Sequence, residues 1–131
     1  MAGENVELFW RTVEAFNSAD VEGAVRACDT DVEFLPQRAA VQGALHGHAG
    51  IREFFADNSE NLDMFVTDYT DVRDLGDRIL AIGTIRIRGK GSGIETDIPS
   101  ALVLDFRAGR LVRFQDYADK RVALEVVGLG E

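Results

Sequence analysis

The chain has 131 residues, 46% of them hydrophobic and 28% charged, which is typical of one globular domain and excludes gross disorder. Acidic residues outnumber basic residues 23 to 14, and the resulting net charge of −9 repels phosphate backbones, so we expect no nucleic-acid partner. No stretch approaches the roughly 20 apolar residues of a membrane span, and no basic segment leads into an apolar run near Met1. The expected location is therefore the cytoplasm, with no membrane contact.

The first 28 residues are typical of two helices. Asn5 can cap the first helix, in which apolar residues recur at helical spacing: Val6, Phe9, Trp10, Val13 and Phe16. Asp20 can cap a second, short helix that runs to Cys28, where a buried and inert thiol is expected. Because Cys28 is the only cysteine, an internal disulfide and a four-thiolate metal site are both excluded.

A short strand is predicted over residues 32–35, and Pro36 ends it. Residues 37–47 carry few signals of either kind and are expected to form a loop. A third helix is predicted from Ile51 to about Glu60, with Ile51, Phe54 and Phe55 on its buried side.

The second half of the chain is typical of strands, over residues 64–75, 79–88, 98–106 and 111–118, followed by a helical tail at residues 120–127. Residues 89–93 are rich in glycine, but no helix start follows them, so a hairpin turn is favoured over a phosphate site. Helices early and strands late predict an α+β fold with a largely antiparallel sheet, in a single domain over residues 1–131.

Asp116 is the first candidate for a functional residue. It lies in a strand otherwise suited to burial, where an ionisable group is costly unless it has a partner. Asp119 is a weaker candidate, because it can instead cap the final helix. His46 and His48 could assist an acid, but two histidines without a third ligand do not make a metal site, and we expect no metal or cofactor.

The order of these segments resembles the nuclear transport factor 2-like superfamily, and most closely its SnoaL-like branch, which is named for polyketide cyclases. The resemblance is carried by residues 13–20, 31–34, 47–55, 76–78 and 116–119. It implies a cone-shaped, cystatin-like α+β fold in which three N-terminal helices pack on a curved, mixed, largely antiparallel sheet. A short C-terminal helix, a pocket inside the cone and a homodimer formed through the sheet are also implied.

The catalytic residues of one reaction mechanism of this superfamily are absent from this sequence. Relatives of ketosteroid isomerase use a tyrosine, an aspartate base and a protonated acid, and these positions align with Thr12, Phe34 and about Leu102. A phenyl ring cannot abstract a proton, and a leucine cannot hydrogen-bond a dienolate. Steroid isomerisation by that mechanism is therefore not expected.

A second reaction mechanism of this superfamily has only some of its catalytic residues in this sequence. Relatives of limonene epoxide hydrolase use two aspartates bridged by an arginine, and the resemblance matches Asp116 and Arg86 to one aspartate and the arginine. The position of the second aspartate holds Arg88, so the acid that would protonate an epoxide is missing.

SnoaL-like cyclases need less: an apolar cavity and one acid that moves a proton while an enolate forms. Asp116 is our candidate for that acid, with Arg86 as an ion-pair partner that would lower its pKa. The expected pocket walls are Trp10, Val13, Phe34, Phe54, Phe65, Leu102 and Phe114. The strand face with Ile85 and Ile87 is expected to be buried in the dimer.

The leading interpretation is a protein that holds a small, mostly apolar organic molecule in its cone. It would catalyse a cyclisation, isomerisation or hydration of a polyketide- or steroid-like compound without a cofactor, with Asp116 as the acid–base. The alternative is a ligand-binding or dimerisation module without catalysis, in which Asp116 and Arg86 only lock the sheet.

Overall fold

The computed structural model describes residues 2–130. Its first half contains most of the helices: α1 (Ala2–Asn17), α2 (Val21–Ala27), β1 (Cys28–Leu35), α3 (Ala39–Gln42), β2 (Leu45–His46) and α4 (Gly47–Asn61). Its second half contains the long strands and the final helix: β3 (Leu62–Asp74), β4 (Arg78–Gly89), β5 (Glu95–Arg107), β6 (Arg110–Tyr117) and α5 (Lys120–Val126). The fold is therefore the expected α+β arrangement.

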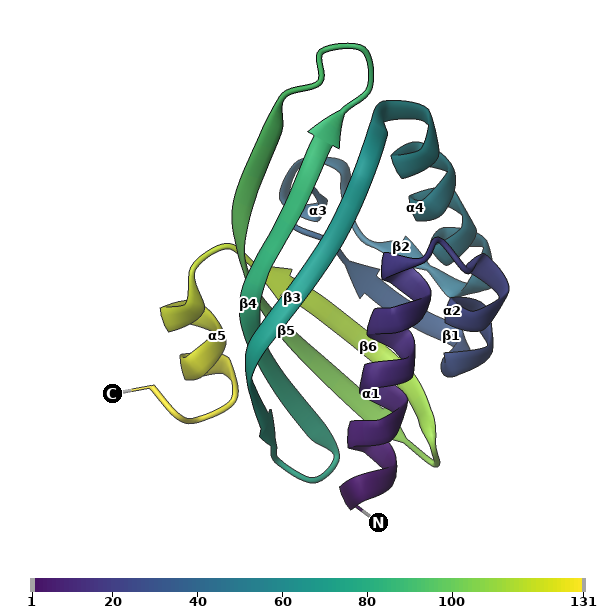
Figure 1. Ribbon diagram of the computed structural model, residues 1–131. Helices are drawn as coiled ribbons and strands as arrows, with labels where there is room; N and C mark the ends of the chain where they lie inside the picture. The colour runs from purple at the N-terminus through teal and green to yellow at the C-terminus, as the bar shows by residue number, and fades with distance from the viewer. Residues whose placement is uncertain (1, 131) are drawn as a thin grey trace.

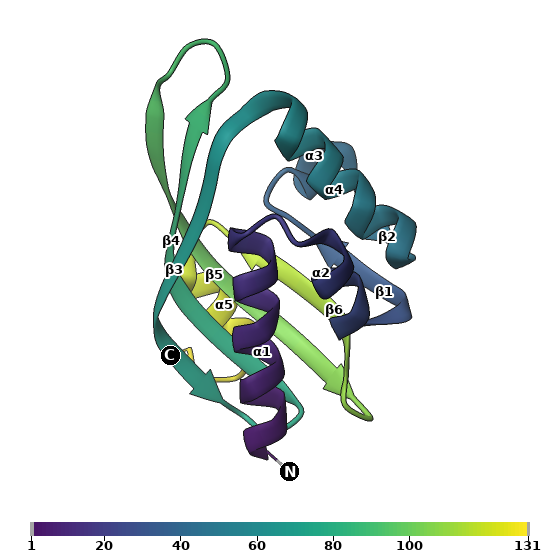
Figure 2. The same cartoon turned by 45° about the vertical axis from the view of Figure 1, so that its right-hand side comes forward.

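The strands form one mixed sheet in the order β2-β1-β6-β5-β4-β3. β1 runs parallel to β6, and the other neighbouring pairs are antiparallel. The sheet is strongly curved, with α1, α2 and α4 on its concave side and α5 on the opposite side (Figure 1 and Figure 2). This arrangement leaves the interior of a cone between the helices and the concave face.

Side chains alternate between the two faces of the sheet, as period-2 strands require. In β4, Ile79 and Ala81 join the main core under the helices, whereas Leu80 joins a smaller core against α5. The smaller core also contains Ala101, Val103 and Ala123. α5 therefore covers the outer face as α1 and α4 cover the concave face, and the sheet separates the two cores.

Six phenylalanines fill much of the space between the helices and the concave face: Phe16, Phe34, Phe54, Phe55, Phe65 and Phe114. The rings of Phe34 on β1 and Phe114 on β6 are stacked, with centroids 4.1 Å apart. These two strands are the parallel pair, so the stacked rings lie beside each other at neighbouring strand positions. Aromatic contacts of this kind add to the stabilisation from buried area alone.

Two expectations about the first helix are wrong. α1 begins at Ala2, before Asn5, and the Asn5 side chain donates a hydrogen bond to the carbonyl oxygen of Gly76 at 3.0 Å. Trp10 is 43% exposed, because the neighbouring Phe9 takes the inward position and is fully buried. Adjacent helix residues point about 100° apart, so both rings cannot face the core.

Other local expectations have mixed outcomes. Asp20 caps α2 as predicted, accepting a hydrogen bond from the Gly23 N–H at 3.0 Å. The predicted loop over residues 37–47 instead holds α3 and β2, and β1 begins at Cys28 rather than at residue 32. These elements are short and are set by their neighbours, since β2 is held by pairing with Glu33 and Phe34 of β1.

The face that carries Ile85 and Ile87 is the concave face, not an outer face open to a second subunit. Both side chains line the interior of the cone, and Ile85 is buried there. The expectation that these residues form a dimer contact is wrong, because alternation along a strand shows which residues share a face and not which face is outside.

Candidate functional site

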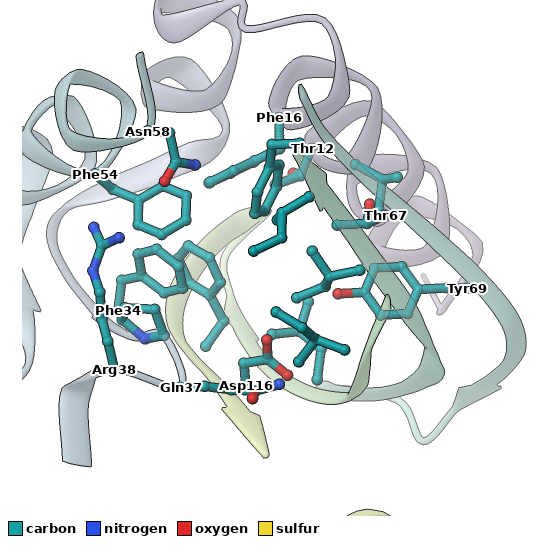
Figure 3. A pocket seen from close by; sticks show the side chains of 18 of the residues that line it. Thr12, Phe16, Phe34, Gln37, Arg38, Phe54, Asn58, Thr67, Tyr69 and Asp116 are labelled. Atoms are coloured by element: carbon teal, nitrogen blue, oxygen red, sulfur yellow. The ribbon is translucent and has the colours of Figure 1, made fainter. Parts of the chain in front are cut away.

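A cavity of about 410 Å³ lies between α1, α4 and the concave face of the sheet. Its walls are mostly aromatic and aliphatic, and Phe16, Phe34 and Phe54 stand around it in Figure 3. Six of the seven residues expected in its walls line it: Val13, Phe34, Phe54, Phe65, Leu102 and Phe114. Trp10 is the exception, since it lies on the exposed side of α1.

Asp116 lies on β6 opposite Leu102 of β5, so its side chain points to the concave face and lines the cavity. One carboxylate oxygen, Oδ1, accepts a hydrogen bond from the Ser100 hydroxyl at 2.7 Å. The Gln37 side chain and the Ala101 backbone N–H also donate to this carboxylate. Removal from water nevertheless outweighs these donors and raises the pKa of Asp116 to about 6.

Gln37 reaches Asp116 from the segment between β1 and α3. Its Nε2 donates to the carbonyl oxygen of Pro99 at 2.7 Å and has a second hydrogen for the carboxylate. Pro36 precedes it, ends β1 and lines the cavity as well. Gln37 therefore connects this segment to β5 and fixes one side of the Asp116 carboxylate.

Tyr69 and Ser100 form the buried side of the cluster of polar side chains around Asp116. The Tyr69 hydroxyl lies 3.0 Å from Ser100 Oγ, and both residues are buried, at 8% and 2% exposure. Tyr69 lines the cavity, whereas Ser100 lies behind its wall. In Figure 3 the Tyr69 hydroxyl points towards the part of the cavity that holds Asp116 and Gln37.

A second polar group lies at the exposed edge of the cavity. The Arg38 guanidinium donates to the Asp57 carboxylate at 3.3 Å and lies 4.6 Å from the centre of the Phe54 ring. Both charged side chains are about one third or more exposed, so they mark the side of the cavity that opens to water. Asn58 also lines this side (Figure 3).

The expected ion pair between Arg86 and Asp116 is wrong. Arg86 lies on the outer face of β4, where it is bidentate to Asp97 with a shortest distance of 2.8 Å, and its side chain is 57% exposed. Asp116 lies on the concave face of β6, with β5 between the two strands. Without this cation the pKa of Asp116 is raised, not lowered.

Asp119 has a structural role at the start of α5. Its carboxylate accepts a hydrogen bond from the Arg121 backbone N–H at 2.9 Å and pairs with the Arg121 side chain, which lowers its pKa. It is exposed and does not line the cavity. The alternative role considered for it, a helix cap, is the one that the structure shows.

The two histidines also lie outside the cavity lining. A ring nitrogen of His48, Nε2, is 3.0 Å from the Cys28 carbonyl oxygen, which ties the start of α4 to β1. Across residues 2–130 there is no group of three or more His, Cys, Asp and Glu side chains placed to hold a metal ion. Neither is any helix in this range both long and apolar enough to cross a membrane.

The positions aligned with the ketosteroid isomerase residues do meet inside the cavity. Thr12, Phe34 and Leu102 all line it. Thr12 donates its hydroxyl hydrogen to the Leu8 carbonyl oxygen of its own helix at 2.7 Å, so this hydrogen is already used. The three aligned positions therefore lie together in the cavity, but none of them carries the functional group that the isomerase mechanism needs.

Sequence reasoning missed Gln37, Tyr69 and Ser100. Ser100 offered a signal, since it is the one hydroxyl in the otherwise apolar run of residues 98–104, where an unpaired polar group is costly. Gln37 and Tyr69 offered none. Their contacts with Asp116 and Ser100 depend on strand register and on the course of the β1–α3 segment.

Comparison with known proteins agrees with this fold. A profile of the SnoaL-like domain matches residues 10–114, and no curated protein sequence matches significantly. A nuclear transport factor 2-like protein of unknown function from Burkholderia pseudomallei has a TM-score of 0.79 at 22% identity, covering 95% of this chain and 98% of its own.

Two further solved structures are similar over nearly their whole length. TerC, co-crystallised with polyporic acid, has a TM-score of 0.79 at 24% identity, over 95% of this chain and 98% of that chain. A candidate SnoaL-like polyketide cyclase from Shewanella putrefaciens has a TM-score of 0.77 at 17% identity, over 98% of both chains. With the profile match over residues 10–114, they show that this chain belongs to the SnoaL-like family and has the cone-shaped fold of the nuclear transport factor 2-like superfamily.

Proposed function

We propose that the protein binds a small, mostly apolar organic molecule in its cavity and that Asp116 transfers a proton to and from this molecule without a cofactor. One observation supports this most directly: a carboxylate lines an aromatic cavity, and no cationic side chain within residues 2–130 pairs with it. Its pKa is raised to about 6 because it is withdrawn from water. A polyketide- or steroid-like compound with an acidic C–H next to a carbonyl fits this chemistry.

The raised pKa suits Asp116 to act as a general base near neutral pH. At pH 7 most of the side chain is ionised, yet it is a stronger base than an ordinary aspartate. A carboxylate has about four acceptor positions, and Ser100, Gln37 and Ala101 occupy three of them. One position is left for a proton from the bound molecule.

The cavity supports binding of a compound of the size of two or three fused rings. Its volume of about 410 Å³ lies at the lower end of the usual range for small-molecule sites, roughly 300–1,000 Å³. Its walls favour apolar surface, and its charged groups lie at two places, Asp116 at one and Arg38 with Asp57 at the other. Membership of a family with relatives named as polyketide cyclases supports the same class of ligand.

Hydrogen–deuterium exchange of 2-tetralone, a two-ring ketone with acidic C–H groups, tests this function in D₂O by proton NMR. We expect the protein to accelerate exchange next to the carbonyl and Asp116→Asn to lower the rate roughly 10²-fold or more, with binding retained. Asp97→Asn is the control, because it removes a carboxylate from the outer face.

The outcome also separates catalysis from binding alone. Saturation-transfer difference NMR, in which irradiated protein protons pass saturation to a bound ligand, shows whether 2-tetralone binds. This measurement does not depend on exchange. A wild-type protein that binds 2-tetralone without accelerating its exchange would be a ligand-binding module, and the acid–base role of Asp116 would be rejected. Equal rates for the wild type and Asp116→Asn would reject it as well.

A further inference from the structure

Two cavity residues on different strands are joined by a third residue that the cavity does not reach. Tyr69 on β3 and Asp116 on β6 both line the cavity, and Ser100 on β5 lies behind its wall. Ser100 Oγ is 3.0 Å from the Tyr69 hydroxyl and 2.7 Å from Asp116 Oδ1. We call these three side chains the hydroxyl chain.

The direction of the hydroxyl chain follows from the donors that each group has. An ionised Asp116 can only accept, so Ser100 must give its single hydrogen to Oδ1. The Ser100 oxygen then accepts the hydrogen of Tyr69. Burial and the negative charge of Asp116 raise the pKa of Tyr69, so that its hydroxyl keeps the hydrogen that this arrangement needs.

A glycine on the strand between them lets Tyr69 reach Ser100. Gly83 of β4 lies opposite Tyr69 on one side and opposite Ser100 on the other. A Cβ at this position would lie 1.9 Å from the Asp68 carbonyl oxygen and 2.7 Å from the Tyr69 Cα. The absence of a side chain therefore permits both the close approach of β3 and the path of the Tyr69 ring across β4.

We propose that Tyr69 is a second catalytic residue, and that the hydroxyl chain turns its hydrogen into the cavity when Asp116 becomes protonated. This proposal rests on the proposed function, since it assigns the group that stabilises the enolate which Asp116 creates. Ser100 is a positioning residue in it, because it acts only through its two neighbours.

The step conserves every proton. The C–H bond of the bound ketone breaks, its hydrogen ends on Asp116 Oδ1, and the electron pair moves to the carbonyl oxygen. Asp116 now donates to Ser100 Oγ, Ser100 turns its hydrogen to the Tyr69 oxygen, and Tyr69 turns its hydrogen to the enolate oxygen in the cavity. Only hydroxyl groups rotate in the last three movements, and the reverse sequence returns the proton to a carbon.

In the part of the chain that the structure describes, no other charged side chain competes with this arrangement near Asp116. Among the described residues, the remaining charged groups that line the cavity are Arg38 and Asp57, which pair with each other at its exposed edge. The donors that face Asp116 from other elements are Gln37 and the Ala101 N–H, and neither of them titrates. The titration of Asp116 therefore reports mainly on its burial and on the hydroxyl chain.

A titration followed by carboxyl ¹³C NMR tests the chain without any ligand. Ser100→Ala removes a donor to the ionised carboxylate, so we expect the midpoint of Asp116 to rise by about one to two pH units. Tyr69→Phe should raise it by a smaller amount. In the Ser100→Ala background, Tyr69→Phe should add nothing, because the connection is already broken. Tyr117→Phe, on the outer face, is the matched control.

The double variant decides the result. Equal shifts from Tyr69→Phe with and without Ser100 would mean that Tyr69 acts directly on Asp116, and the hydroxyl chain would be rejected. Tyr69→Phe keeps the ring and its packing, so its own shift can be measured even if Ser100→Ala fails to fold, and a wild-type midpoint in Tyr69→Phe would also reject the hydroxyl chain.

Exchange of 2-tetralone then tests the catalytic role. Tyr69→Phe and Ser100→Ala should each lower kcat at least about tenfold with little change in KM, and the double variant should fall no further than the slower single variant. Wild-type rates in both variants, with loss only in Asp116→Asn, would reject the role of Tyr69 and leave the proposed function intact. If Asp116 has no acid–base role, the Asp116→Asn variant will instead exchange the hydrogens of 2-tetralone as fast as the wild type does.

Discussion

The charge on Asp116 affects stability in a way that depends on pH. Burial in the cavity raises its pKa from an ordinary 3.8 to about 6 in the folded protein. Between these two values the folded protein holds a proton that the unfolded chain has lost, so the unfolding free energy falls as the pH rises. The favourable contribution is complete below about pH 4 and is lost above about pH 6. A site that keeps a basic carboxylate at neutral pH therefore reduces the stability of its own fold.

Asp116→Asn should remove this pH dependence. The unfolding free energy of the wild type relative to the variant should fall by about 2 kcal/mol between pH 4 and pH 7, which is most of the roughly 3 kcal/mol that the whole pKa change corresponds to. Urea unfolding of both proteins across this range measures the difference. Asp68→Asn, on the exposed outer side of β3, is the control for removal of one charge. A constant difference across the range would contradict the raised pKa.

Asp119→Ala should affect the fold and not the cavity. It removes the side-chain cap of α5, so we expect a small but measurable decrease in the urea midpoint of unfolding. Binding and exchange of 2-tetralone should stay at the wild-type level, since Asp119 does not line the cavity. If exchange falls as it does in Asp116→Asn, the assignment of Asp119 as a cap alone is wrong.

The sequence identified Asp116 as an ionisable residue in a strand otherwise suited to burial, but it did not predict which side chains surround it. Alternation along β4 separates Ile85 from Arg86, yet nothing in that alternation says which of them faces the helices. The curvature of the sheet decides this, and it places Ile85 inside and Arg86 outside. A partner for Asp116 could not be named without the register of three strands.

Elements with a clear sequence pattern and a marked start were predictable, because their own residues define them. β4 and α5 lie within one residue of the predicted ranges, since each has clear periodicity and a turn or cap at its start. α3 and β2 have four and two residues and carry no such period. They form because β1 and α4 hold the connecting segment in place, and the same segment brings Gln37 to Asp116.

Gly83→Ala should damage the sheet at the point where β3 and β4 approach most closely. The new methyl group would collide with the backbone of β3, so the strands must separate, and we expect a loss of about 3 kcal/mol or more. Gly3→Ala, with nothing within 4 Å of the added carbon, is the control and should change stability little. An unchanged urea midpoint for Gly83→Ala would show that β3 is not held at this distance.

The whole molecule was recognisable from the order of its elements, because the cone needs helices first and long strands afterwards. The same order does not determine the chemistry inside the cone, which depends on a few side chains such as Asp116 and Tyr69. Three residues that align with a known isomerase site meet in this cavity without any of its functional groups. Family membership therefore predicts where a ligand lies better than what happens to it.

A homodimer is the remaining expectation from the resemblance, and any association through the sheet must use its outer face. The concave face encloses the cavity, whereas on the outer face α5 exposes Val122 and Val126 and the segment after it exposes Leu129, each more than 40% accessible. Val122 and Val126 are one helical turn apart and form an apolar strip that a second copy would cover. We therefore propose that two copies associate through α5 and the outer face of the sheet.

Sedimentation equilibrium at micromolar concentration should give twice the 14.4 kDa mass of one chain. Replacing both Val122 and Val126 by glutamate should give the mass of a single chain, because two charges would be buried in the contact. Val41→Glu is the control, since Val41 is 91% exposed on α3, away from this face. Exchange of 2-tetralone should be unchanged in the double variant, because α5 contributes no residue to the cavity. A wild-type protein that sediments as a single chain would reject the dimer, whereas a double variant that stays dimeric would place the contact elsewhere.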